Sequence, residues 1–276
     1  MNRLDLTIII PCATDIKIKH CIQSIYETCV DDIEILVSLN GASRGVKEIL
    51  KNFQSVKVCE IKEANLSKAY NNGIKHSSRN NILLMDSDCV FDKNTIKLLY
   101  NGLKYEKLSK GLVIFRNNNL MSKIISKVRE YTTTDFISAY SPPLAFSKDI
   151  KNLIGGYYFD ERVPWSEDSE FNYRVQRAGL KIYYNPKAVI YHAPIKVAQD
   201  IRSGFKYGRG KRISEKLNLL PETNYLTIST HTKKFMKTYA VFRTKGLLPA
   251  LYYFFIWRPS NRIGYLWQIF AGDKKS

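Results

Sequence analysis

The first ninety residues alternate between short apolar runs and segments of helical periodicity, and this alternation limits the fold more than any other feature. Four runs rich in β-branched or aliphatic side chains are typical of buried strands, at residues 6–10, 33–37, 56–61 and 81–85. Segments whose apolar residues recur at helical spacing lie between them, at residues 18–29, 46–53 and 66–76. Strands that alternate with helices predict βαβ units, and therefore an α/β fold with a mostly parallel sheet flanked by helices.

The residues after position 90 follow a less regular pattern. Helical segments are expected at residues 95–104, 120–131 and 166–178, and short strands at 112–115, 181–184 and 188–191. Residues 135–147 contain Pro142 and Pro143 and are expected to form a loop. With 45% apolar and 25% charged residues and no internal repeat, the chain has the composition of a globular protein.

Two aspartates, Asp86 and Asp88, follow the fourth predicted strand with one residue between them. Because ionised carboxylates this close repel each other, a cation between them would be stabilising, and carboxylate oxygens are ligands that Mg²⁺ and Mn²⁺ prefer. A polar turn is the alternative, since Asp and Ser are common turn formers. Ligands of open α/β sheets bind beyond the carboxyl ends of the strands. Pro11 and Asn40 also fall at such ends, which favours a binding site without excluding the turn.

A second acidic pair, Glu167 and Asp168, opens a predicted helix directly after Ser166. Serine is a good N-cap and acidic residues are favourable in the first turn of a helix, so capping alone explains the pair. The functional alternative makes one carboxylate a general base, which must lie within hydrogen-bond reach of a nucleophile. Both alternatives are open on the sequence.

Two further groups are candidates for binding metal or phosphate. His192 follows the last predicted strand. A single histidine is more often structural, but near a carboxylate pair its imidazole is a plausible third metal ligand or diphosphate contact. Arg209 lies between Gly208 and Gly210 in a basic segment, which suits a phosphate contact as well as it suits a solvated loop.

Basic charge is concentrated at the C-terminal end of the chain. The formal net charge is +18, and residues 196–276 hold sixteen Lys/Arg against four Asp/Glu. Between residues 235 and 270 the basic residues are interleaved with aromatic ones. Such a mixture suits an anionic bilayer or single-stranded nucleic acid, and a core-packing helix with a basic outer face is the plain alternative. We expect a helical, basic and aromatic C-terminal extension over residues 197–276.

Cysteine usage and hydropathy bear on the cellular compartment. The five cysteines show no CxxC spacing: Cys12, Cys21, Cys29, Cys59 and Cys89. Their odd number and scatter argue against a disulfide framework or a thiolate zinc site, and suit a reducing cytoplasm. The first residues do not resemble a signal peptide. The longest apolar stretch, residues 247–257, is about half as long as the roughly 20 residues that a membrane span needs.

Taken in order, these motifs resemble those of the family 2 glycosyltransferases of the GT-A fold. The matching segments are residues 7–12, 35–43, 64–74, 84–88, 154–161 and 166–168, followed by Arg174, Gly179 and residues 191–192. The resemblance covers roughly residues 4–212. It implies a GT-A, Rossmann-like catalytic domain over residues 1–196, with a nucleotide-binding half at 1–90 and an acceptor and catalytic half at 91–196.

The resemblance also implies roles for individual residues. Asp88 is similar to the family's metal ligand, Asp86 to the carboxylate near the ribose or the metal, and His192 to the residue that completes the metal or diphosphate site. Asp168 resembles the catalytic base, with Glu167 beside it. The implied reaction is inverting: Asp168 takes a proton from an acceptor hydroxyl, which attacks the anomeric carbon from the face opposite the nucleotide. Mn²⁺ or Mg²⁺ would offset the charge that builds on the departing diphosphate.

Pro11, Asn40 and Asn71 are similar to residues that line the family's nucleotide pocket. Two positions depart from the family: Leu39 and Asn40 stand where paired acids are usual, and Tyr70 stands at a usual arginine position. The resemblance implies a nucleotide-sugar donor, for which a UDP-sugar is expected, and a glycan or lipid-linked acceptor in surface polysaccharide or glycoconjugate synthesis. Together with the basic extension, it predicts a cytoplasmic protein that is peripheral at the inner face of the cell membrane.

Two other functions fit parts of the sequence. A nucleotidyltransferase shares the α/β sheet and the acid-bound metal, but it usually carries a glycine-rich, basic loop after the first strand, which residues 11–14 lack. A basic nucleic-acid-binding protein would use the charge of +18. No nucleic-acid motif accompanies that charge, and an acidic cluster without a metal repels phosphate. We therefore predict an enzyme, a metal-dependent glycosyltransferase, with no nucleic-acid partner.

Overall fold

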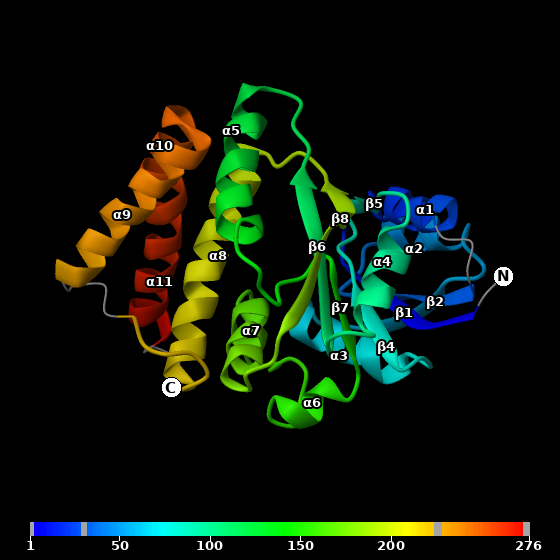
Figure 1. Cartoon of the computed structure of the whole chain (residues 1–276). Helices are drawn as coiled ribbons and strands as arrows, with labels where there is room; N and C mark the ends of the chain where they lie inside the picture. Colours follow the sequence, from blue (N-terminus) through cyan, green and yellow to red (C-terminus); the bar gives the residue numbers. More distant parts are fainter. Residues whose placement is uncertain (1–2, 29–31, 224–227, 273–276) are drawn as a thin grey trace. The chain divides into compact units, whose positions relative to one another are not determined.

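The computed structural model describes residues 3–28, 32–223 and 228–272 (Figure 1). The chain divides into two compact units. The first, here called the sheet unit, comprises Met1–Ile114, Ile137–Arg162 and Glu167–His192. The second, here called the helical unit, comprises Phe115–Phe136, Val163–Ser166 and Ala193–Ser276. The boundary of the catalytic domain expected at residue 196 stays a prediction.

Eight strands in the described residues form one mixed sheet, in the order β3-β2-β1-β4-β7-β6-β8-β5. They are β1 (Arg3–Cys12), β2 (Asp32–Asn40), β3 (Lys57–Ile61), β4 (Asn81–Leu84), β5 (Cys89–Phe91), β6 (Leu108–Phe115), β7 (Leu144–Ser147) and β8 (Ile182–His192). The first four strands pair in parallel, whereas β4 with β7, β7 with β6, and β8 with β5 pair antiparallel. The predicted α/β sheet flanked by helices is confirmed, and its parallel part is the part that the alternation of the first ninety residues predicts.

The register of the parallel strands brings their carboxyl ends to one edge of the sheet. Cys12, the last residue of β1, pairs with Leu39 near the end of β2. Ile9 of β1 pairs with Leu84, the last residue of β4. The two aspartates that follow β4 therefore lie at the same edge as the last residue of β2, where ligands of open α/β sheets bind.

Within the described residues, six helices flank the sheet of this unit: α1 (Ile18–Thr28), α2 (Arg44–Leu50), α3 (Leu66–His76), α4 (Thr95–Gly102), α6 (Ile150–Leu153) and α7 (Glu167–Arg177). Side chains cap two of them, α2 and α3. At the start of α2 the Val46 N–H donates to Ser43 Oγ, and at the start of α3 the Lys68 N–H donates to Asn65 Oδ1. These side chains satisfy backbone donors that have no partner within the helix, so the polar residues before each apolar segment fix where the helix begins.

The core of the sheet unit is an aromatic and aliphatic cluster to which α3, α7 and the central strands contribute. Phe171 of α7 is fully buried, and its ring lies 5.0 Å from that of Phe159 and 5.7 Å from that of Phe146 in β7. Burying a side chain of this size stabilises the fold by about 1.5–3 kcal/mol. The acids at the start of α7 are therefore anchored to the sheet by the apolar residues of the same helix.

Two expectations for the residues after position 88 were wrong, and two short elements there were not predicted. Residues 135–147 are not all loop, because their last four form β7, which lies between β4 and β6 in the sheet. The two short strands expected at 181–184 and 188–191 are one strand, β8, which continues through Pro186. β5 and α6 were not expected at all. Elements of three or four residues carry too little periodicity to detect, and Pro186 is tolerated because it lies at an exposed position of its strand.

The helical unit contains α5 (Leu120–Arg129), η1 (Glu130–Thr134), α8 (Val197–Lys216), α9 (Ile228–Lys245), α10 (Leu247–Tyr252), η2 (Tyr253–Trp257) and α11 (Arg258–Gly272). The helical C-terminal extension is therefore confirmed. Its core includes a buried ion pair, in which Arg129 Nε donates to Asp200 Oδ1 at 2.7 Å while Tyr252 Oη donates to Asp200 Oδ2 at 2.9 Å. Arg129 also lies over the Trp257 ring, 4.1 Å from its centroid. A buried charge needs such partners, since leaving one unpaired is strongly destabilising.

Helices α8 and α11 approach each other closely (Figure 1). A Cβ atom at Gly208 of α8 would lie 1.8 Å from the carbonyl oxygen of Asn261, and one at Gly264 of α11 would lie 1.9 Å from that of Phe205. Both glycines are therefore required by backbone packing rather than by a phosphate-binding loop. In the described residues, no helix combines the length and apolar character that a membrane span requires.

Replacing Gly208 by alanine is expected to lower the free energy of unfolding by about 1–3 kcal/mol, because the added methyl group would overlap backbone that cannot move aside cheaply. The matched control is Gly45→Ala in α2, where nothing lies within 4 Å of the added Cβ. That substitution should be neutral or slightly stabilising, since alanine is the better helix former. Urea unfolding of both variants measures the difference, and equal midpoints would contradict the close packing.

The four described cysteines, Cys12, Cys21, Cys59 and Cys89, are free thiols, and Cys29 lies outside the described residues.

Candidate active site

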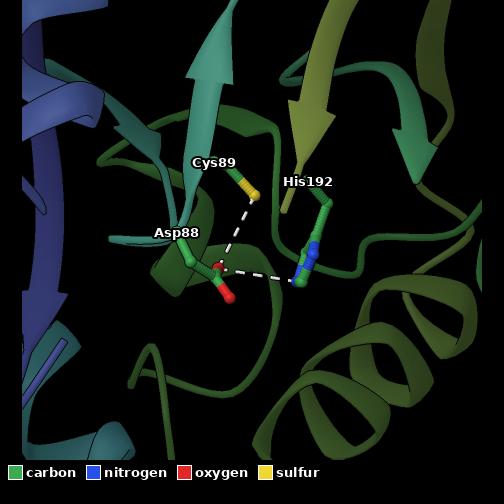
Figure 2. Close-up of side chains that lie close together, drawn as sticks. All are labelled: Asp88, Cys89 and His192. Atoms are coloured by element: carbon green, nitrogen blue, oxygen red, sulfur yellow. Dashed lines mark hydrogen bonds and ion pairs between the residues drawn. The ribbon is translucent and has the colours of Figure 1, made fainter. Parts of the chain in front are cut away.

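Asp88 and His192 meet because β5 and β8 pair antiparallel. Cys89 in β5 stands directly opposite His192, the last residue of β8, so the residue before Cys89 reaches the imidazole. Figure 2 shows the two side chains pointing toward each other, with Asp88 Oδ1 3.5 Å from His192 Nε2. Both side chains are 14% exposed, so a ligand can reach them. The sequence places these residues more than a hundred positions apart, and the sheet brings them together.

Cys89 completes the group, with its ligand atom within 4.8 Å of those of Asp88 and His192. Its thiol lies 3.9 Å from Asp88 Oδ1 and donates to it (Figure 2). Burial, followed by the charges of Asp86 and Asp88, raises the pKa of this thiol well above its usual value. The group therefore offers a carboxylate oxygen and an imidazole nitrogen but no thiolate. Without a soft sulfur ligand, this donor set fits a divalent ion of the Mn²⁺ or Mg²⁺ type better than zinc.

Asp86, the first aspartate after β4, is half-buried. Tyr70 Oη donates to its Oδ1 at 3.4 Å and also lies 3.2 Å from Ser141 Oγ. Burial, followed by the charges of Asp88 and Asp168, raises the pKa of Asp86 to about 8. Asp86 does not belong to the group formed by Asp88 and His192 within 4.8 Å. Its repulsion with Asp88 is nevertheless the kind of strain that a bound cation relieves, so the site fits a metal by charge as well as by ligand type.

Asp168 lies in the first turn of α7, on an element separate from the metal-type ligands. Burial, followed by the charge of Glu167, raises the pKa of Asp168 to about 8. The Ser141 N–H and the ammonium group of Lys110 act in the opposite direction. Asp168 Oδ1 is buried and has no hydrogen-bond partner among the described residues. A carboxylate oxygen kept free in this way is what a general base needs, because it can still accept a proton.

Lys110 is the charged residue of the site that the sequence prediction missed. It lies on β6, is only 4% exposed, and donates from Nζ to the carbonyl oxygens of Tyr140 and, at 3.0 Å, Pro142. Burial lowers the pKa of Lys110 to about 8, while Asp168 and Asp86 oppose that change. One ammonium group thus faces both the candidate base and the first aspartate after β4. A lysine at a buried position of a strand is the signal that was available, but the strand was predicted to begin only at residue 112.

The loop at residues 139–143 is fastened to α7 by several hydrogen bonds. The Ala139 N–H donates to Asn172 Oδ1 at 2.8 Å, and Ser169 Oγ donates to Tyr140 Oη at 3.4 Å. Lys110 holds the same loop from the sheet side. The loop, the lysine and the start of α7 therefore form one supported structure around Asp168, although no residue of this loop was proposed as a site residue.

Arg174, one of the family-like motif residues, holds α7 to the segment before it. Its guanidinium donates to both oxygens of Glu170 and, at 2.9 Å each, to the carbonyl oxygens of Ile154 and Tyr157. It also lies over the Tyr157 ring at 3.9 Å from the centroid. The buried Arg174–Glu170 pair is therefore fully bonded, which identifies Arg174 as support for the helix that carries Asp168.

The residues expected to line the nucleotide pocket differ in whether their polar atoms already have hydrogen-bond partners in the protein. Asn40 is 8% exposed, and its Oδ1 has no partner among the described residues, so it can accept from a ligand. Pro11 is buried in β1 beside Ser38. Asn71, in contrast, donates from Nδ2 to Phe159 O at 2.8 Å and to Glu161 Oε1 at 3.0 Å. That amide holds the 159–161 segment, and its contact with a nucleotide stays a prediction.

Arg209 belongs to the helical unit, where it lies within α8 and not in a loop. Its Nε donates to Gln268 Oε1 at 3.1 Å, and its guanidinium lies over the Trp267 ring at 4.4 Å. Its expected phosphate contact also stays a prediction. Of the nine expected site residues, the sheet unit thus brings Asp88 and His192 into contact and places Asp88 and Asp168 within electrostatic reach of Asp86.

Known proteins resemble the chain in sequence and in fold. The family model described as "Glycosyl transferase family 2" matches residues 7–147. A protein of Methanococcus voltae, "Dolichyl N-acetyl-alpha-D-glucosaminyl phosphate 3-beta-D-2,3-diacetamido-2,3-dideoxy-beta-D-glucuronosyltransferase", is 26% identical over 242 residues, which is 75% of this chain and 72% of that protein.

Two solved structures share the fold. The crystal structure of S. aureus TarS 1-349 matches with a TM-score of 0.55 at 14% identity, over 100% of this chain and 92% of that one. The mannosyltransferase PcManGT from Pyrobaculum calidifontis, in complex with GDP-Man and Mn²⁺, matches with a TM-score of 0.57 at 15% identity, over 100% of this chain and 77% of that one. At these sequence identities the two structures show only that the fold is shared.

Proposed function

The chain belongs to glycosyl transferase family 2, and from this membership we propose that it is a metal-dependent, inverting glycosyltransferase that uses a nucleotide-sugar donor. The observation that carries the proposal is the separation of two kinds of carboxylate in the sheet unit. Asp88 lies beside His192 on one side, while Asp168, on α7, keeps a buried oxygen without a partner among the described residues. An inverting transfer needs both: a cation site for the leaving diphosphate and a base that the cation does not occupy.

Each residue has a distinct part in the proposed reaction. Asp88 and His192, with Asp86, would hold Mn²⁺ or Mg²⁺, which supplies positive charge against the diphosphate when bound. Asp168 accepts the proton of the acceptor hydroxyl as that oxygen attacks the anomeric carbon, and Glu167 sets the charge beside it. The face of attack is opposite the nucleotide, so the configuration at the anomeric carbon inverts.

The donor and the acceptor are proposed from the relatives and from the pocket. PcManGT was solved with a nucleotide sugar and Mn²⁺, and the M. voltae protein is named for a lipid-linked sugar phosphate. We therefore infer a nucleotide-sugar donor and a glycan or lipid-linked acceptor in surface glycan synthesis. A UDP-sugar, which the resemblance to the family implies, is the first donor to test. The unpartnered Asn40 oxygen would accept from the base, and Pro11, Asn71 and Arg209 are candidates for further contacts. The protein would act at the inner face of the cell membrane.

A panel of nucleotide sugars tests this proposal by thermal shift, with and without Mn²⁺. We expect one donor to raise the melting temperature only when Mn²⁺ is present, because a ligand at about 100 times its Kd adds roughly 2.7 kcal/mol of stability. Asp88→Asn should lose this shift, since it removes the charged ligand beside His192.

The matched control is Asp149→Asn, which removes a surface carboxylate that pairs with Lys107 at 2.5 Å. It should keep the Mn²⁺-dependent shift of the wild type. A wild-type protein that no nucleotide sugar stabilises in the presence of Mn²⁺ or Mg²⁺ would sink the proposal, and an unchanged shift in Asp88→Asn would remove Asp88 from the cation site.

A further inference from the structure

The end of the helical unit has a charge composition unlike the rest of the chain. Residues 223–272 contain no aspartate or glutamate and seven Lys/Arg. Fifty residues without a carboxylate cannot neutralise their own positive charge, so this segment attracts an anionic partner. The positive charge also opposes self-association of two copies through this surface, because like charges would face each other.

The same segment exposes apolar side chains in helical register. On α9, Phe235, Tyr239 and Phe242 recur at the spacing of one helix face, and all three are exposed. On α10 and η2, Leu247, Leu251 and Phe255 recur every four residues and are also exposed.

The opposite side of α10 and η2 is packed inside the helical unit. Tyr252, Tyr253 and Trp257 are buried there, and the Tyr253 ring lies 5.8 Å from that of Tyr131. Helices α10 and η2 therefore already bury one apolar side, and their exposed apolar residues form a second, separate side.

The two exposed rows meet in an apolar groove, because α9 and α10 lie side by side (Figure 1). The groove has a volume of about 210 Å³ and is lined by both rows together with Thr238, Ala250 and Phe254. We call this surface the α9–η2 face. Its lining offers almost no hydrogen-bonding group, so its natural occupant is hydrocarbon and not a polar peptide or sugar.

Positive charge next to the groove comes from α9. Arg243 follows Tyr239 by four residues, which puts it on the adjacent turn of the same face of α9, and it is exposed. Lys237 is exposed too, but it lies roughly 200° around the helix from Phe235 and therefore on another side of α9. Lys245 differs, because it pairs with Glu130 at 3.4 Å and Asp135 at 3.0 Å inside the helical unit. Arg243 thus supplies charge to a partner at the groove, while Lys245 is structural.

We propose that the α9–η2 face docks the protein on an anionic lipid bilayer, with acyl chains against the groove and lipid phosphates against Arg243. A bilayer interface offers hydrocarbon and negative charge together, which is the combination that this face presents. Single-stranded nucleic acid offers negative charge too, but it binds in grooves whose basic side chains follow its backbone, and none of the described residues that line this groove is Lys or Arg. The inference rests on the proposed function in one respect, the lipid-linked acceptor that the docked enzyme would meet.

Liposome flotation of the full chain tests this docking. Vesicles of phosphatidylcholine with a minority of phosphatidylglycerol should float the wild-type protein, pure phosphatidylcholine vesicles should float much less, and high salt should reduce binding. The double variant Phe235→Ser, Phe255→Ser should bind the anionic vesicles at least about tenfold more weakly. Its two positions are 69% and 65% exposed, so the fold does not depend on them. The matched control is Leu120→Ser on α5, which is 64% exposed and should bind like the wild type.

Two results would overturn the inference: a wild-type protein that stays in the bottom fraction with anionic vesicles, or a double variant that floats as well as Leu120→Ser. Binding of a single-stranded oligonucleotide by a protein that does not float would assign the face to nucleic acid instead. The double variant should keep the Mn²⁺-dependent thermal shift with a nucleotide sugar. If flotation is lost while the thermal shift remains, the docking surface has failed. If the thermal shift is absent while flotation remains, the proposed function has failed.

Discussion

Asp168→Asn is expected to lower kcat for sugar transfer by about 10²- to 10⁴-fold, the usual contribution of a positioned general base. The amide cannot accept the proton of the acceptor hydroxyl, yet it has nearly the same shape as the carboxylate. Donor binding should change little, because Asp168 lies on α7, apart from Asp88 and His192. Single-turnover transfer measures the loss, and the thermal shift with the nucleotide sugar measures donor binding in the same variant.

Glu167→Gln is the matched control, since it makes the same change one residue earlier in α7. The charge of Glu167 raises the pKa of Asp168, so its removal should lower that pKa and move the rising limb of the kcat profile to lower pH. Activity above that limb should fall far less than in Asp168→Asn. Near-normal turnover in Asp168→Asn would refute its assignment as the base, and a greater loss in Glu167→Gln would transfer the role to Glu167.

Stability provides an independent check that the Asp168 variant is folded. The pKa of Asp168 is about 8 in the folded protein, against about 3.9 for an ordinary aspartate. The folded state therefore keeps a proton that the unfolded chain has lost, and this stabilising contribution falls as the pH rises toward 8. Asparagine is uncharged at every pH. Asp168→Asn should thus unfold at a temperature equal to or above that of the wild type near pH 8.

The sequence predicts the parallel half of the sheet and the candidate metal ligands, because the signals for both are local. A buried strand needs a short apolar run, and the residues at its carboxyl end are known once the strand is known, which is how Asp86, Asp88 and Asn40 are found. His192 is found the same way at the end of β8. The direct 3.5 Å approach of His192 to Asp88, however, depends on the pairing of β5 with β8, and a three-residue strand has no detectable period.

The surroundings of the base could not be predicted for a different physical reason. Lys110 and the loop at 139–143 act on Asp168 through contacts between segments that are about thirty to sixty residues apart in sequence. Pro142 and Pro143 indicate a loop correctly but say nothing of the helix that the loop contacts. A buried lysine is also unusual enough that hydropathy assigns it to the surface. Only the paired sheet shows that its ammonium group faces carboxylates and carbonyl oxygens.

Lys110→Met is expected to raise the pKa of Asp168 and to move the rising limb of the kcat/KM profile to higher pH. The ammonium group of Lys110 stabilises the ionised form of Asp168, and methionine fills a similar volume without charge. Other groups that act on Asp168 remain in place: burial and Glu167 continue to raise its pKa, and the Ser141 N–H continues to lower it. A displacement of one pH unit would cost about tenfold in activity below the limb, and activity should recover as the pH is raised.

The matched control for this prediction is Lys148→Met in the same unit. Lys148 is also partly buried, and it donates to the carbonyl oxygen of Ser77 at 2.8 Å, but the carboxylates that act on it are Glu34 and Asp5. Both methionine variants leave a carbonyl oxygen without its donor, so both should lose about 1–3 kcal/mol of stability. Only Lys110→Met should displace the pH profile. An unchanged profile in that variant would mean that Lys110 anchors the loop at 139–143 without acting on the base, because loss of an anchor lowers stability and leaves the pKa of Asp168 where it was.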